Sequence, residues 1–135
     1  KSVMVSSGEA KSKVELLEPC KMLAAHGYDI YATDGTCKFL EENGVKATAV
    51  GWPDEPSELQ IMDMMAEKRF ELVVNIPKNH TRRELTNGYK IRRGAIDHNI
   101  PLMTNARLAS AFIHAFCSLK QDDIQIKDWA SYFKN

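Results

Sequence analysis

The stretch FELVVNI, from Phe70 to Ile76, decides the fold that this sequence predicts. It is a run of β-branched and other apolar residues, interrupted by one acidic and one amide side chain. Such a run is typical of a strand whose two faces are both buried. Strands of that kind belong to parallel sheets that helices cover on each side. The stretch therefore predicts an α/β protein rather than an antiparallel sheet with one face in water.

Helical and extended segments alternate strictly on both sides of this strand. Before it, the pattern predicts strands at 2–6, 28–33 and 45–51, separated by helices at 11–26, 36–43 and 57–68, the last capped by Ser57. After it come a helix at 89–98, a strand at 100–105, a helix at 106–119 and a last helix in the tail, anchored by Trp129 and Phe133. Pro19 means that the first helix either begins near Glu18 or is kinked. The order predicts a three-layer α/β/α fold with a five-stranded parallel sheet.

The composition indicates one globular domain that spans residues 1–135. Hydrophobic residues make up 44% of the chain, and 18 basic residues balance 18 acidic ones. This balance predicts neither nucleic acid nor a membrane as a partner. Three cysteines and four histidines lack disulfide or metal-ligand spacing, which predicts no metal and a reducing, cytoplasmic compartment. Because the chain begins KSVMV, without a methionine, we expect a piece of a longer protein.

The stretch ATDGT, at 32–36, lies where ligands bind in such sheets, just beyond the carboxyl end of a strand. Thr33 and Thr36 flank Asp34 and Gly35, directly before a predicted helix. One interpretation is an ordinary turn in which Thr36 or Asp34 caps the helix and Gly35 permits the tight bend. The other is a site where both hydroxyls and the helix amides bind phosphate or carboxylate. Spacing alone favours the ordinary turn, because such turns are common.

No motif for a catalytic nucleophile or a dinucleotide accompanies this stretch. The patterns G-x-G-x-x-G, G-x-x-x-x-G-K-[ST] and G-x-S-x-G do not occur in the sequence. The carboxylates near the strand ends have no partner that the sequence reveals; they are Glu9, Asp34, Asp54 and Glu58. A binding module is therefore favoured over an enzyme.

Five short motifs, in their order and spacing, resemble the methylglyoxal-synthase-like regulatory domain at the carboxyl terminus of the carbamoyl-phosphate synthetase large subunit. They are ATDGT at 32–36, AVGWP at 49–53, LVVNIP at 72–77, YKIRRGAID at 89–97 and IPLMTN at 100–105. The resemblance implies a domain without catalytic residues or a cofactor of its own, which binds a small-molecule effector. It implies control of ATP- and Mg-dependent ligase domains in arginine or pyrimidine biosynthesis. The implied partners are those domains and a glutaminase subunit or domain, and a homo-oligomer is possible.

The resemblance also implies which residues bind the effector. The phosphate-contacting lysine of the family matches one lysine here, its paired threonines match the two of ATDGT, and its asparagine matches the end of the central strand. The implied effector site is Lys13, Thr33, Gly35, Thr36, Trp52, Asn75 and Lys78, with Thr104 as an interdomain or second effector position.

Trp52 and Lys78 leave the identity of the effector open between two candidates. Trp52 stands where UMP-inhibited bacterial relatives have a lysine, so a nucleotide site here keeps Lys13 but loses one cation. An N-acetylglutamate-like ligand would use the threonines, Trp52 and Asn75. Lys78, however, stands where the ammonia-dependent animal form has an asparagine. A nucleotide such as UMP or IMP is the first candidate, and N-acetylglutamate is the second.

Methylglyoxal synthase itself, which acts on dihydroxyacetone phosphate, is the enzymatic alternative. By the resemblance its aspartate base falls near Glu58, and its first histidine–aspartate pair falls on Ser7 and Gly8. Its later histidine and aspartate fall near Leu85 and Gly88. The phosphate site is thus kept while the acid–base set is missing, so proton abstraction has no evident agent. The resemblance favours a non-catalytic domain.

Overall fold

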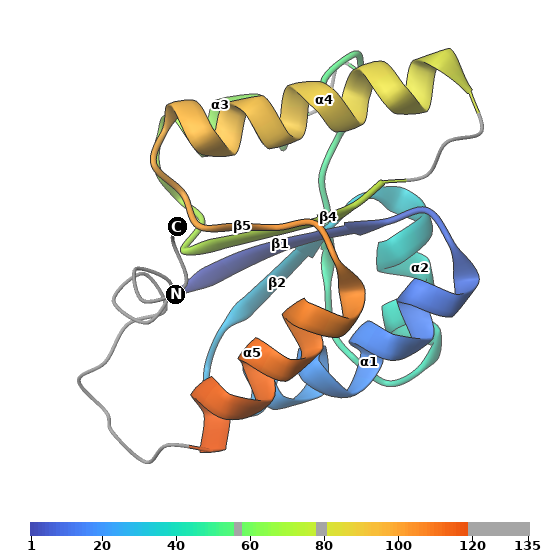
Figure 1. Cartoon of the computed structure of the whole chain (residues 1–135), viewed down its shortest axis with the longest axis vertical. Helices are drawn as coiled ribbons and strands as arrows, with labels where there is room; N and C mark the ends of the chain where they lie inside the picture. Colours follow the sequence, from blue (N-terminus) through green and yellow to red (C-terminus); the bar gives the residue numbers. More distant parts are fainter. Residues whose placement is uncertain (56–57, 78–80, 119–135) are drawn as a thin grey trace.

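The sheet that the sequence predicts is present and entirely parallel. The computed structural model describes residues 1–55, 58–77 and 81–118. Five strands lie in the order β3-β2-β1-β4-β5. They are β1 (Ser2–Ser7), β2 (Asp29–Ala32), β3 (Thr48–Ala49), β4 (Leu72–Ile76) and β5 (Leu102–Met103). Helices cover both faces in Figure 1, which confirms the three-layer α/β/α fold with a five-stranded parallel sheet.

Two hydrophobic clusters hold the helices on the sheet, because successive strand residues point to opposite faces. On one face Val3 and Val74 pack with α1 (Ala10–Ala25), α2 (Asp34–Glu42) and α5 (Ala106–Ser118). On the other face Met4 and Val73 pack with α3 (Ile61–Ala66) and α4 (Arg82–Asp97). Leu72, Val73 and Val74 are at most 1% exposed. The stretch that decided the fold is therefore buried on both faces, as predicted.

The first helix begins earlier than one of the two predictions for it. α1 begins at Ala10 and runs through Pro19, so a start near Glu18 is wrong. Pro19 has no N–H for the carbonyl four residues earlier, which normally interrupts a helix. Here Pro19 is buried, as are Leu16 and Leu23, which belong to the hydrophobic cluster on this face of the sheet. We infer that this packing offsets the missing hydrogen bond.

The helices on the other face begin at different residues from those predicted. α4 begins at Arg82, seven residues before the predicted start, because the Thr81 hydroxyl accepts the backbone N–H of Glu84 at 3.1 Å. This side-chain cap replaces a helical hydrogen bond that the first turn lacks. α3 begins at Ile61, where Gln60 accepts the N–H of Met62 at 2.6 Å. The predicted cap, Ser57, lies outside the described residues.

The remaining predictions concern the edges, the tail and the cysteines. β3 and β5 have two residues each, far fewer than the predicted 45–51 and 100–105. The predicted tail helix with Trp129 and Phe133 lies outside the described residues. Cys20, Cys37 and Cys117 are buried free thiols, and burial raises the pKa of Cys20 to about 12. In the described part of the chain, no helix has the length and apolarity needed to span a membrane.

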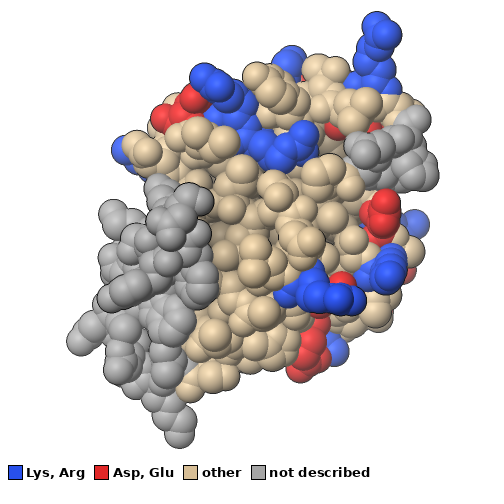
Figure 2. Space-filling view, in the orientation of Figure 1, with Lys and Arg blue, Asp and Glu red and all other residues tan. Residues whose placement is uncertain are grey.

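Charged side chains are mixed on the visible surface. On the face in Figure 2, Lys and Arg side chains are scattered, and several of them lie near Asp or Glu. The described residues on this face therefore form no broad basic area, in keeping with 18 basic and 18 acidic residues in the chain. A site for an anion has to be local.

Candidate functional site

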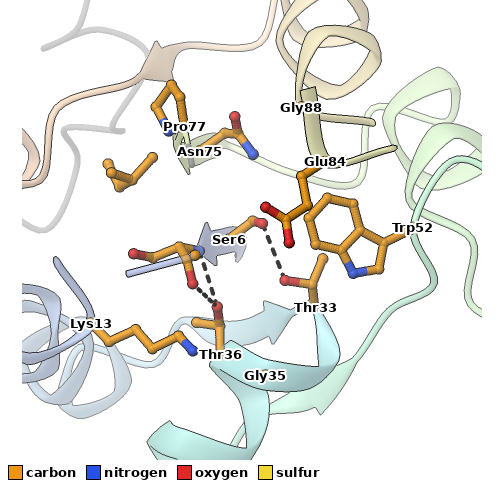
Figure 3. A pocket seen from close by; sticks show the side chains of 13 residues that line it. Ser6, Lys13, Thr33, Gly35, Thr36, Trp52, Asn75, Pro77, Glu84 and Gly88 are labelled. Atoms are coloured by element: carbon orange, nitrogen blue, oxygen red, sulfur yellow. Dashed lines mark hydrogen bonds between the residues drawn. The ribbon is translucent and has the colours of Figure 1, made fainter. Parts of the chain in front are cut away.

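A cavity opens where three neighbouring strands end. β1 lies at the centre of the sheet, with β2 on one side and β4 on the other. The chain leaves β1 toward β2 and returns later to β4, so this is the point where ligands bind in open parallel sheets. The cavity has a volume of about 170 Å³. It is lined by Ser6, Ser7, Gly8, Lys13, Thr33, Gly35, Thr36, Trp52, Asn75, Ile76, Pro77, Glu84 and Gly88 (Figure 3).

One side of the cavity, which we call the threonine wall, combines the ends of β1 and β2 with the starts of α1 and α2. It consists of Ser6, Ser7, Lys13, Thr33, Gly35 and Thr36. The Thr36 hydroxyl accepts the N–H of Ser7 at 3.0 Å and donates to the Ser7 carbonyl at 3.1 Å. The Thr33 hydroxyl donates to the Ser6 hydroxyl at 3.1 Å (Figure 3). Ser6, Ser7, Thr33 and Thr36 are at most 4% exposed, so this part of the wall belongs to the core.

The ordinary-turn interpretation of ATDGT fails on these contacts. Thr33 is the residue that precedes α2, yet its side chain makes no capping hydrogen bond. Thr36 and Asp34 do not cap the helix either, because Thr36 is bonded to β1 and Asp34 is the first helical residue. The first backbone N–H donated within α2 is that of Cys37, which reaches the Thr33 carbonyl at 2.8 Å. The amides of Asp34, Gly35 and Thr36 precede it, in the turn where helix donors lack helical acceptors.

Lys13 brings a positive charge to the same place. It comes from the first turn of α1, and its side chain reaches across to α2. A methyl group added at Gly35 would lie 3.4 Å from the Lys13 Nζ atom, so the ammonium group lies against the start of α2. A helix start carries a partial positive charge of its own. Two positive sources therefore meet at one end of the cavity.

Ser7 contributes a buried hydroxyl to this end. Its Oγ atom is shielded from solvent and has no hydrogen-bond partner among the described residues. The residue is 4% exposed and lines the cavity. Buried polar atoms in native proteins nearly always have a partner, from the protein or from a bound molecule. The Ser7 hydroxyl therefore marks a position that a ligand or solvent atom would occupy.

The opposite side, which we call the α4 wall, consists of Trp52, Asn75, Glu84 and Gly88. Asn75 is 3% exposed, and its Oδ1 atom accepts a hydrogen bond of 2.7 Å from Arg92 of α4. This contact leaves the Asn75 Nδ2 group as the donor for the cavity. Glu84 projects from the first turn of α4, beside the Trp52 indole (Figure 3). The threonine wall thus presents hydroxyl groups and the Lys13 ammonium group, whereas the α4 wall presents an amide, an indole and a carboxylate.

A surface ion pair joins the two segments of the α4 wall. Arg83 donates to Asp54 through Nε at 2.6 Å and through its terminal nitrogen at 3.0 Å. This hydrogen bond lowers the pKa of Asp54 and raises that of Arg83. Asp54 follows Trp52 in the β3–α3 loop, while Arg83 precedes Glu84 in α4. The pair therefore holds the tryptophan loop beside the start of α4.

The structure brings most of the predicted effector residues together. Six of them line the one cavity, namely Lys13, Thr33, Gly35, Thr36, Trp52 and Asn75. Lys78 lies outside the described residues. Thr104 is exposed at the end of β5 and is not among the lining residues, so its role between domains stays a prediction.

Sequence reasoning missed Glu84, which is the acidic residue of the α4 wall. The carboxylates considered from the sequence were Glu9, Asp34, Asp54 and Glu58, and none of them lines the cavity. The sequence pattern places Glu84 in a loop, because it predicts that this helix begins at Tyr89. The signal that could have found it is the run Thr81 to Glu84, whose T-x-x-E spacing matches the capping box at helix starts. Among the described residues, no group of acidic, cysteine and histidine side chains has the arrangement of a metal site.

One family model and several known proteins are similar to the chain in sequence. The family model of the MGS-like domain matches residues 15–104. The chain is 37% identical over 135 residues to the multifunctional protein pyr1-3 of Dictyostelium discoideum, covering 96% of the chain and 6% of that protein. It is 36% identical over 129 residues to the multifunctional protein CAD of Squalus acanthias, covering 85% of the chain and 6% of that protein.

Two further comparisons concern a bacterial section and a solved structure. The chain is 36% identical over 111 residues to the C-terminal section of the carbamoyl phosphate synthase large chain of Aquifex aeolicus, covering 82% of the chain and 20% of that section. The crystal structure of methylglyoxal synthase from Elizabethkingia anophelis matches with a TM-score of 0.55 at 16% identity, covering 98% of the chain and 90% of that protein. This last likeness concerns the fold alone.

Proposed function

This chain belongs to the MGS-like domain family, and from that membership and the cavity we propose that it is a regulatory, effector-binding domain of a carbamoyl-phosphate synthetase. Its ligand is an anionic small molecule, with a nucleotide such as UMP or IMP as first candidate and N-acetylglutamate as second. The observation that carries the proposal is the meeting of the Lys13 ammonium group with the start of α2 at Gly35. The unpartnered Ser7 hydroxyl supports it.

The threonine wall suits an anion because its donors are already in place. Lys13 supplies a full charge, and the first amides of α2 supply aligned dipoles, which together favour phosphate or carboxylate. Each charge-assisted hydrogen bond contributes about 1.5–3 kcal/mol. Because the wall is buried and bonded internally, little reorganisation is needed when the anion arrives.

The threonines have different roles in this proposal. The Thr36 hydroxyl already accepts from and donates to the Ser7 backbone, so Thr36 is a positioning residue. Thr33 donates to Ser6, which leaves the Ser6 hydroxyl proton to point toward a ligand. On the α4 wall, Asn75 offers its amide N–H group and Trp52 covers the part of the ligand away from the anion.

Regulation requires a longer protein than this chain. The chain spans 6% of the length of two of the relatives that it matches. We propose that its partners are the ATP- and Mg-dependent synthetase domains and a glutaminase subunit or domain, in the cytoplasm, and that the domain itself holds no cofactor. Effector binding changes the activity of those domains only by a difference in affinity between two states, typically about 1–3 kcal/mol.

Isothermal titration of the chain tests the proposal. The ligands are UMP, IMP, phosphoribosyl pyrophosphate, N-acetylglutamate, ornithine and arginine. We expect an anionic ligand to bind, and Lys13→Met to weaken it by roughly ten-fold or more, because one charge-assisted contact is lost. The matched control is Lys11→Met, an exposed lysine of the same helix. Binding that is no tighter than roughly millimolar for every ligand, or equal losses in both variants, contradicts the proposal.

One observation supports methylglyoxal synthase as the second candidate function. Glu84 places a carboxylate in the cavity, and a carboxylate can act as a general base. The described lining residues include no histidine that could supply the acid for that chemistry. The test is methylglyoxal formation from dihydroxyacetone phosphate. Turnover that Glu84→Gln abolishes would replace the regulatory proposal with the enzymatic one.

A further inference from the structure

Two glycines lie inside α4, and their surroundings differ. Glycine is less favourable in a helix interior than any residue except proline, so each position calls for a reason. A methyl group added at Gly94 would lie 2.7 Å from the Met65 Cε atom and 3.0 Å from the Met62 Cε atom, so the close packing of α4 on α3 accounts for Gly94. At Gly88, the three nearest atoms that a methyl group would meet all belong to the Arg92 side chain. Packing on α3 therefore does not explain Gly88.

Gly88 leaves room for the Arg92 guanidinium group. A methyl group at Gly88 would lie 2.8 Å from Nη1, 3.6 Å from Cζ and 3.7 Å from Nη2 of Arg92, so this group occupies the place where a side chain would begin. Nη1 is also the atom that donates to the Asn75 Oδ1 atom at 2.7 Å. Gly88 and Asn75 both line the cavity. The atom that holds the Asn75 amide is thus the one that needs the space at Gly88.

This contact decides which end of the Asn75 amide faces the cavity. An asparagine side chain can accept through its oxygen or donate through its nitrogen, whereas a guanidinium group only donates. The reversed amide would set donor against donor beside Arg92, and Asn75 is 3% exposed, so water cannot readily compensate. Arg92 therefore turns the Nδ2 group of Asn75 toward the cavity. A donor in that position suits an oxygen acceptor on the ligand.

We propose that Gly88 is a positioning residue of the effector site, because the absence of a side chain there lets Arg92 hold the Asn75 amide with its N–H group toward the ligand. This inference rests on the proposed function and deepens it. The effector then carries an oxygen acceptor, such as a ring carbonyl or a carboxylate, in addition to the anion at the threonine wall. The guanidinium group is the end of a flexible side chain, so a substitution at Gly88 should displace it without unfolding α4.

The variant Gly88→Ala tests the proposal. We expect it to weaken UMP and N-acetylglutamate by about three- to ten-fold, because one hydrogen bond to the ligand is lost. Inorganic phosphate, which reaches the threonine wall alone, should bind unchanged. The side-chain amide signals of Asn75 should shift in NMR spectra of the chain without any ligand. Alanine favours a helix more than glycine does, and circular dichroism checks that α4 stays folded.

Gly94→Ala is the matched control, since it makes the same substitution in the same helix. Its methyl group would meet Met62 and Met65 and not Arg92. It should leave the Asn75 signals and all three affinities unchanged. If Gly94→Ala and Gly88→Ala weakened UMP equally, a general change in α4 would explain both results, and the proposal would be overturned.

A double substitution tests whether Gly88 acts through Arg92. In an Arg92→Met background, Gly88→Ala should weaken UMP no further, because the contact that it breaks is already absent. A second loss of the same size would mean that the added methyl group obstructs the ligand directly, and that result overturns the proposal.

The outcomes separate this inference from the function on which it rests. If phosphate, UMP and N-acetylglutamate all fail to bind the unmodified chain, the effector site fails, and the NMR signals of Asn75 still decide whether Gly88 positions its amide. If the ligands bind and depend on Lys13, but Gly88→Ala changes neither UMP affinity nor the Asn75 signals, only the role of Gly88 is overturned.

Discussion

The two walls of the cavity differ in how they are held. In the threonine wall, Thr36 is bonded to the backbone of β1 inside the core and is 2% exposed. In the α4 wall, the segments that carry Trp52 and Glu84 are joined by the pair of Arg83 and Asp54, whose side chains are 60% and 37% exposed. The threonine wall is therefore bonded into the core, while the Trp52 and Glu84 segments of the α4 wall are joined by a surface contact.

This difference suggests a division of labour within the proposed effector site. A wall built into the core can present the same anion-binding donors whatever ligand follows. Where a wall is held by surface contacts, its side chains can be substituted at little cost in stability, because exposed ion pairs contribute little to the free energy of unfolding. Recognition of the common anion and selection of the particular ligand can thus change independently.

The largest effect is expected from breaking the threonine wall at Thr36. Thr36→Val keeps the shape of the side chain and removes its hydroxyl, which leaves the Ser7 N–H and carbonyl without that partner. Buried groups left unsatisfied cost about 1–3 kcal/mol each, so we expect a loss of about 2–4 kcal/mol in the free energy of unfolding. Chemical denaturation measures it.

The control for Thr36 is the exposed Thr48 of β3. Thr48→Val should change the stability by less than about 0.5 kcal/mol, as surface substitutions usually do. If Thr36→Val were as mild as Thr48→Val, the threonine wall would not be part of the core, and the contrast between the walls would be lost.

A smaller effect is expected where the α4 wall meets the core, at Arg92. Arg92→Met removes the 2.7 Å hydrogen bond to Asn75 and lets its side-chain amide turn over. We expect a loss of about 1–2 kcal/mol in stability, because the donor is charged and the contact only partly buried. UMP affinity should also fall several-fold, because Asn75 no longer presents its N–H group reliably.

The neighbouring Arg93 provides a matched control. It forms an exposed pair with Asp97 at 3.1 Å, and its side chain is 62% exposed. Arg93→Met should leave both stability and UMP affinity nearly unchanged. Equal effects from the two arginines would show that Arg92 acts through the charge of α4 and not through Asn75.

The sequence predicted the threonine wall better than the α4 wall, for a physical reason. Thr33 directly follows β2, and Thr36 comes three residues later, so a hydrophobic run locates both threonines at the carboxyl edge of the sheet. Glu84 lies three residues into a helix that begins in a polar segment. Periodicity does not reveal such a start, because its first turn contributes no buried apolar residue.

Hydrogen bonds inside the threonine wall were also beyond prediction. The spacing of ATDGT favours a capped turn, since a threonine before a helix usually caps it. Only the register of β1 against β2, with Val5 opposite Ala32, brings Ser7 within reach of Thr36. That register depends on the packing of the whole sheet. The fold was therefore predictable from local patterns, and the roles of the two threonines were not.

A milder substitution, at Thr33, tests whether Thr36 contributes more than its neighbour to the stability of the threonine wall. Thr33→Val removes one hydroxyl–hydroxyl contact of 3.1 Å, to Ser6. We expect a loss of about 1 kcal/mol in stability, because the Ser6 hydroxyl can rotate toward another acceptor. Thr33→Ser, which keeps the hydroxyl, should restore most of it. A loss as large as that of Thr36→Val would show that both threonines secure the backbone of β1.

The smallest effect is expected from acid, which acts on the α4 wall through Asp54. Arg83 lowers the pKa of Asp54, so the pair stabilises the folded chain above the ordinary carboxyl range, and this contribution is lost as pH falls through the lowered pKa. The groups around the pair are Glu55, 3.7 Å from Arg83, and Glu84 in the same turn of α4. Below about pH 4, backbone NMR signals of Trp52 should shift, while those of Thr36 stay in place. The shift should be absent in Asp54→Asn, which separates it from titration of the two glutamates. A contrary result would be a Thr36 signal that moves together with that of Trp52, and only when Asp54 is present. The conformations of the two walls would then be coupled, and selection of the ligand could not change independently of anion binding.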